Sequence, residues 1–166
     1  LVMSIQDWGA IGEIVGAAGV IVTLIFLSMQ IRANTKESRL SATADIAREY
    51  NAYLQNITSD EQLSALWLRA VDRDFDSLSE EEAARVIMIM GNFFRIMESA
   101  HIQHSSGRMD LTSWQGYERL IARSVNASAF PVYWKLRSTL HGKEFQALIE
   151  AARKQPDETP MFLNSD

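Results

Sequence analysis

The chain of 166 residues contains no cysteine, which excludes a disulfide framework, a thiolate metal site and a cysteine nucleophile. Positively charged side chains are missing from the first part of the chain, where no Lys or Arg precedes Arg32. The whole chain carries 16 basic and 21 acidic residues, a net charge of −5, with no basic run. Phosphate backbones are bound by clustered positive charge, so we expect no nucleic-acid partner.

Complete catalytic motifs are also missing. The sequence has no HExxH motif, no glycine-rich phosphate loop and no Ser-His-Asp order. We therefore expect no cofactor and favour a protein that is not an enzyme. Hydrophobic residues make up 47% of the chain, which suits a folded globular protein rather than a disordered one.

A long apolar run stands near the start of the chain. Residues 8–31 hold a single charge, Glu13, and no charge follows it between Ile14 and Ile31. As a helix this segment would extend about 36 Å, against about 30 Å for a hydrocarbon core. We predict a transmembrane helix over residues 8–31 after a short segment 1–7. The alternative is a buried central helix of a soluble oligomer.

Basic residues follow this helix immediately. Arg32, Lys36 and Arg39 stand at its C-terminal end, whereas the N-terminal side has none. The positive-inside rule then places the N-terminus outside and residue 32 onward in the cytoplasm. A cleaved signal peptide fits poorly, because basic residues normally precede the apolar part of such a peptide.

Small residues form a stripe along the predicted span. They recur at steps of three and four and share one helix face: Gly9, Gly12, Gly16, Gly19 and Thr23. In lipid such a face lets two helices approach closely and gain packing contacts. We predict that this small-residue stripe docks on a second copy of the chain or on another membrane subunit.

The remaining residues, 32–154, predict a bundle of about five helices followed by a disordered tail, 155–166. No proline or glycine interrupts residues 20–90, so the span should continue as a helix into the bundle. Its predicted buried stripe comprises Leu40, Thr43, Ala47, Tyr50, Leu54 and Ile57. No window shows the alternation of a strand, which makes the expected fold all-α.

Helix boundaries are marked by capping residues. Asp60 is a predicted N-cap, and Ser79 with Glu82 forms a capping box before the clearest helix. A second capping box is predicted at Thr112 and Gln115. Pro131 suits the first turn of a further helix, in which Val132, Tyr133, Trp134 and Leu136 are apolar.

One group of residues has metal-ligand character. Glu98, His101 and His104 follow at steps of three on one helix, and a Glu-x-x-His pair can bind iron or zinc in a bundle. The set is incomplete, since the only other histidine, His141, precedes a glutamate in the reversed order. Histidines at a helix end can also serve as caps. A metal- or ligand-binding bundle, either a binding protein or an enzyme, is thus the alternative function.

Two segments resemble a known group of proteins. The run WGAIGEIVGAAGVIVTLIFLSMQIRANTK is similar to the opening of a family of bacterial single-span helical proteins of unknown function. The segment FFRIMESAHIQHSSGRMD is similar to a stretch in the middle of those proteins. The resemblance implies this architecture and a bacterial source, but it assigns no catalytic residue. In a bacterium, the predicted span and the basic residues after it indicate the inner membrane. We therefore expect a membrane-anchored interaction protein or accessory subunit.

Overall fold

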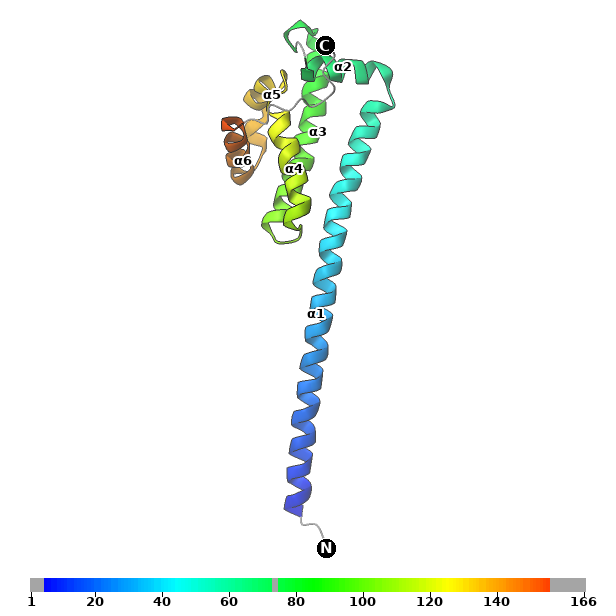
Figure 1. Ribbon diagram of the computed structural model, residues 1–166, viewed down its shortest axis with the longest axis vertical. Coiled ribbons are helices and arrows are strands. Elements are labelled where there is room, and N and C mark those ends of the chain that lie inside the picture. The colour runs from blue at the N-terminus through cyan, green and yellow to red at the C-terminus, as the bar shows by residue number, and fades with distance from the viewer. Residues whose placement is uncertain (1–4, 73–74, 156–166) are drawn as a thin grey trace. The chain divides into compact units, whose positions relative to one another are not determined.

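The computed structural model describes residues 5–72 and 75–155, so the predicted tail beyond residue 155 lies outside the described part (Figure 1). Every element in that part is helical and none is a strand, which confirms the all-α prediction. The helices are α1 (Ile5–Thr58), α2 (Glu61–Asp72), α3 (Glu80–Ser105), α4 (Leu111–Ser124), α5 (Phe130–Arg137) and α6 (Lys143–Lys154). Two 3₁₀ turns complete them, η1 (Phe75–Ser77) and η2 (Ser138–Leu140).

Helix α1 runs without a break from Ile5 to Thr58. Its continuity follows from the sequence, since no proline stands within it and its last glycine is Gly19. Contacts divide the chain into two units, one ending at Ser38 and the other beginning at Arg39. The first unit contains only helical backbone of α1 in its described part, and the second contains the bundle.

Helix α3 is the central helix of the second unit. It packs against α2, α4 and α5, and α6 packs against α4 (Figure 1). Its buried apolar side chains recur at helical spacing and include Val86, Met90, Phe93, Phe94, Met97 and Ala100. The rings of Phe94 and Tyr133 stack at 5.0 Å between centroids, which fixes α5 on α3.

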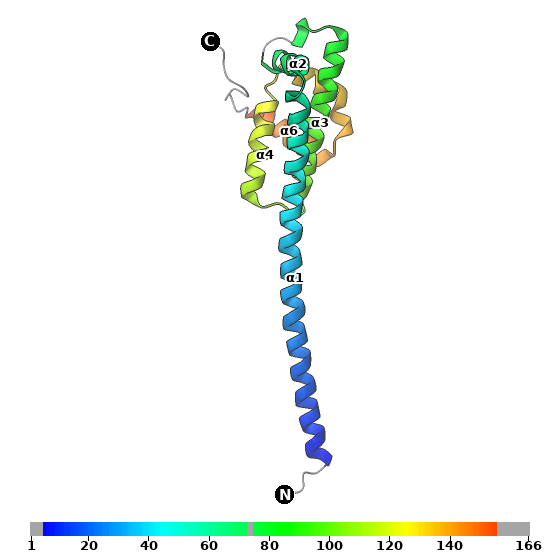
Figure 2. The same cartoon turned by 90° about the vertical axis from the view of Figure 1, so that its right-hand side faces the viewer.

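The C-terminal part of α1 belongs to this core and lies beside α3 and α4 (Figure 2). Its buried side is rotated from the predicted one. Of the predicted stripe, Ile57 is buried and Thr43, Ala47 and Tyr50 are half-buried, whereas Leu40 and Leu54 are exposed. The other buried residues are Ala42, Ile46 and Tyr53. Tyr53 causes the rotation, because its ring packs edge-on against Trp67 and also contacts Phe93, so the helix turns this side inward.

The helix caps follow most of the predictions. The side chain of Asp60 accepts a hydrogen bond from the backbone of Leu63, and Ser79 and Glu82 form the predicted capping box. The prediction at Thr112 is wrong, because Asp110 is the N-cap of α4 and accepts from the N–H of Ser113 at 2.9 Å. An aspartate oxygen two residues earlier satisfies the free N–H groups of the first turn directly.

The C-terminus of α3 and the start of α5 are also set by local chemistry. Gly107 adopts a φ of 72°, and the adjacent N–H of Arg108 bonds back to the carbonyl of Gln103. Pro131 lies in the first turn of α5 as predicted. Leu136, however, is 60% exposed, whereas Tyr133 and Trp134 of the same helix are buried.

Candidate functional site

The small-residue stripe lies on α1 in the first unit. An added Cβ at Gly9, Gly12, Gly16 or Gly19 would meet nothing within 4 Å, so the glycine surface is open. The stripe also contains Thr23, whose hydroxyl donates to the carbonyl of Gly19 at 2.8 Å. Its polar atom is therefore satisfied within the helix itself.

Apolar side chains cover the same part of α1. The exposed ones, each at least 46% accessible, are Val20, Ile21, Val22, Leu24, Ile25, Phe26, Leu27, Met29 and Ile31. The helix thus contains a stretch long and apolar enough to cross a membrane, by length and composition. Ser28 donates its hydroxyl to the carbonyl of Leu24, so its polar atom too is satisfied within the helix.

The three residues proposed as metal ligands lie on α3 but face different partners. Glu98 is buried and bonds to His141 and Gly142. His101 lies between the rings of Trp114 and Phe145, and His104 stacks on Trp114 at 5.1 Å. The Nδ1 atom of His104 is 3.4 Å from the carbonyl oxygen of Met109. Among the described residues, no three potential ligands lie close enough to hold a metal ion.

Burial lowers the pKa of His101, because an apolar environment disfavours the charged imidazolium. The charge of His104 acts in the same direction, whereas Glu144 and Glu98 oppose it. The imidazole therefore loses its proton more readily than an exposed histidine does. This is the behaviour expected of a ring packed among aromatic side chains.

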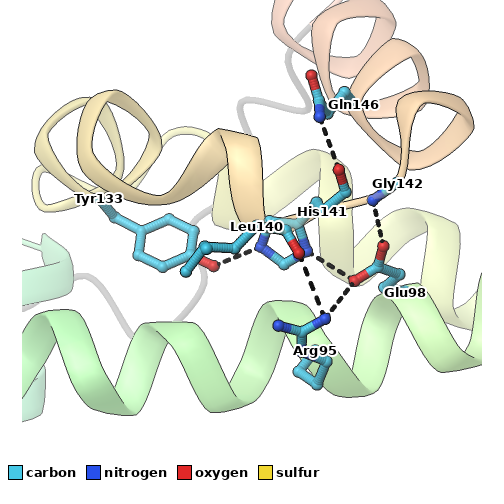
Figure 3. A network of polar contacts seen from close by, with 7 residues as sticks. All are labelled: Arg95, Glu98, Tyr133, Leu140, His141, Gly142 and Gln146. Atoms are coloured by element: carbon cyan, nitrogen blue, oxygen red, sulfur yellow. Dashed lines mark hydrogen bonds and ion pairs between the residues drawn. The ribbon is translucent and has the colours of Figure 1, made fainter.

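A buried polar network joins α3, α5 and the segment after η2 (Figure 3). Glu98 accepts a hydrogen bond from the backbone N–H of Gly142 at 2.6 Å and lies 2.8 Å from His141 Nδ1. His141 Nε2 lies 2.7 Å from the hydroxyl of Tyr133. With its proton on Nδ1, His141 donates to Glu98 and accepts from Tyr133, which satisfies both ring nitrogens of His141.

Arg95 supplies the positive charge of the network. Its Nη1 lies 3.3 Å from the carboxylate of Glu98 and 3.4 Å from the carbonyl oxygen of Leu140. Burial of an unpaired carboxylate would be costly, so these donors explain how Glu98 is tolerated at 7% exposure. The network holds the turn before α6 against α3.

A hollow of about 220 Å³ opens beside this network. Its apolar wall is formed by Ile87, Met88 and Leu140, and Tyr133 and His141 also line it. Two guanidinium groups, from Arg95 and Arg137, complete the lining, and it contains no acidic residue. Gly91 lies in the same wall, where a Cβ would touch only the Tyr133 ring, at 3.7 Å.

Sequence reasoning identified Glu98 but not its partners. His141 is 43 residues away from it, and no spacing rule connects them. A signal was nevertheless present, because Glu98 follows Phe94 by one helical turn on the apolar side of α3. A carboxylate on such a face requires buried donors.

Comparisons with protein-family models, with curated proteins and with solved structures found no match for this chain. The resemblance to bacterial single-span proteins therefore rests on the two quoted segments.

Proposed function

We propose that the protein is a membrane-anchored helical interaction module. In this proposal residues 8–31 of α1 span the bacterial inner membrane with the N-terminus outside. The small-residue stripe docks on a second copy or another membrane subunit, and the cytoplasmic bundle binds a protein partner. The observation that carries the proposal is the exposed apolar part of α1, with its open stripe of glycines.

The length and chemistry of α1 support the membrane part of the proposal. Exposed apolar side chains from Val20 to Ile31 would be costly in water, whereas lipid tails solvate them. Hydroxyl groups within this stretch are bonded to the helix backbone, as lipid requires. Arg32, Lys36 and Arg39 at its end agree with a cytoplasmic bundle.

The open surface of the stripe supports the docking part. Helices in lipid gain little from the hydrophobic effect, so association depends on close backbone approach and van der Waals contact. Four glycines at steps of three and four offer this approach along several turns. A second helix would contact the stripe without displacing any described side chain.

Alkaline carbonate extraction tests the span. The full chain is expressed in bacteria and the isolated membranes are washed with carbonate. We expect the protein to remain in the membrane pellet. Complete release into the supernatant would overturn the anchor and support a soluble oligomer that buries the apolar helix.

Cysteine crosslinking tests the docking face, and the absence of native cysteine makes each introduced thiol unique. Thr23→Cys places a thiol in the stripe. Ser28→Cys is the matched control, because both residues are small, make the same bond four residues back and lie about 140° apart around the helix. We expect oxidised membranes to yield dimers for Thr23→Cys and few for Ser28→Cys. Monomer alone for both variants would contradict self-association, and equal dimer yields would contradict the stripe as its interface.

A further inference from the structure

We propose that the hollow between α3, α5 and η2 binds a small organic anion, with a carboxylate or phosphate head group on a short apolar chain. The ligand's head group would lie on Arg95 and Arg137, and its chain would lie on Ile87, Met88 and Leu140. This inference goes beyond the proposed function and does not depend on the span.

Charge is the first argument. The chain as a whole carries a net charge of −5, yet the lining of this hollow contains two arginines and no acidic residue. Glu98 partly neutralises Arg95 through a contact of 3.3 Å. Arg137 is exposed, and within the described part of the chain it forms no ion pair. A guanidinium fork is matched in shape to a carboxylate or a phosphate.

Convergence of the two arginines is the second argument. Arg95 on α3 and Arg137 on α5 both line the hollow together with Tyr133. Burial raises the pKa of Tyr133, the charge of Glu98 adds to the rise, and the positive charges of Arg95 and Arg137 oppose it. The buried network around His141 fixes Tyr133 and Leu140, so the site has a rigid base.

Apolar surface and size give the third argument. Met88 is 64% exposed and Leu140 is 54% exposed, so both present apolar area at the hollow. Gly91 leaves the wall between the two ends of the hollow without a side chain. At about 30 Å³ per water, the volume corresponds to about seven waters, which suits a ligand of about eight non-hydrogen atoms such as hexanoate.

Photolabelling of the full chain tests the site. The full chain is kept in a zwitterionic detergent and exposed to a short aliphatic carboxylate that carries a diazirine on its chain. Mass spectrometry maps the label, and the label summed over the rest of the chain outside the hollow serves as the internal reference. We expect label on Met88 and Leu140 that excess hexanoate removes and that hexanol, with the same chain but no charge, leaves in place.

Variants separate the head-group contact from general apolar adsorption. Arg137→Gln should reduce label in the hollow about tenfold relative to the reference, since it removes a charged hydrogen-bond donor. Arg119→Gln is the matched control, because Arg119 is an exposed arginine of α4 outside the hollow, and it should have no effect. Gly91→Leu fills the wall and should also abolish the label, with Gly116→Leu on α4 as its control.

Each outcome of these experiments either supports or overturns the proposal. Competition by hexanoate or by hexyl phosphate, with loss in Arg137→Gln, supports the proposal, and the stronger competitor identifies the head group. The proposal is overturned if hexanol competes as well as hexanoate does. It is equally overturned if label in the hollow is absent, or if it is the same in wild type, Arg137→Gln and Gly91→Leu.

Discussion

At the scale of single residues, the most consequential side chain of the bundle is Glu98. A carboxylate at 7% exposure survives because three donors from two separate segments converge on it. The partners come from positions 95, 141 and 142, so the cost of burial is offset only in the folded bundle. The same contacts fix Tyr133 and the turn before α6, which form the base of the hollow.

Removal of the Glu98 carboxylate should destabilise the bundle. Glu98→Ala leaves the Gly142 N–H and His141 without their acceptor, and we expect a loss of about 2–3 kcal/mol in the free energy of unfolding. Glu98→Gln keeps one oxygen for Gly142 and should lose less. Urea unfolding of the full chain in mild detergent, followed by tryptophan fluorescence, measures both. Glu118→Ala, an exposed change on α4, should stay within about 0.5 kcal/mol of wild type. An equally small effect of Glu98→Ala would show that the network contributes nothing to stability.

His101 should make stability fall at mildly acidic pH. Burial holds its pKa below the ordinary value of about 6.5, so between these two values the unfolded chain binds more protons than the folded chain. The free energy of unfolding therefore decreases as the pH is lowered through that window, and it is fully retained above it. His101→Gln should lose less thermal stability than wild type between about pH 7.5 and pH 5. Equal losses in the two proteins would refute this role of His101.

At the scale of elements, local chemistry predicted most of the helices. The capping box at Ser79 and the proline of α5 each depend on neighbours within a few residues, and each was found where expected. The buried stripe of α1 was found only in part, because residues 40–57 carry two overlapping apolar stripes. The choice between them depends on Trp67 and Phe93, which are distant in sequence.

Contacts between distant segments also limited what could be predicted of the candidate site. The position of Glu98 on the apolar side of α3 was readable from the sequence. Its pairing with His141 was not, because that contact forms only when the turn after η2 folds back onto α3. The hollow was unreadable for the same reason, since its two arginines come from α3 and α5.

The N-cap of α4 leads to a prediction about the stability of this helix. Asp110 accepts from both the N–H and the hydroxyl of Ser113, at 2.9 Å and 2.7 Å, whereas Thr112 is exposed. Asp110→Ala should lower the midpoint of thermal unfolding, and Thr112→Ala should leave it unchanged. Ser79→Ala, which removes the cap of α3, should cost about 1 kcal/mol and provides a reference for the assay. If Thr112→Ala lowered the midpoint and Asp110→Ala left it unchanged, Thr112 and not Asp110 would be the cap.

At the scale of the whole molecule, the chain separates what it buries within itself from what it leaves exposed. Every core residue lies at position 42 or later among the described residues, although α1 begins at Ile5. Apart from Leu54, the exposed large apolar side chains of α1 lie instead between Val20 and Leu40. One uninterrupted helix thus serves both units, with an exposed apolar surface in one and a core-facing surface in the other.

This division predicts which fragments fold. A chain of residues 39–166 retains the whole core and should fold without detergent, with a near-ultraviolet circular dichroism signal and cooperative unfolding. A chain of residues 59–166 lacks Ile46, Tyr53 and Ile57, which leaves the faces of Trp67 and Phe93 uncovered, and it should aggregate or unfold without cooperativity. Light scattering then locates self-association. If the longer fragment is monomeric while the full chain in detergent is dimeric, association depends on residues 1–38 and agrees with the stripe. If the fragment is itself dimeric, the bundle carries the interface, and the stripe is left without a role in pairing.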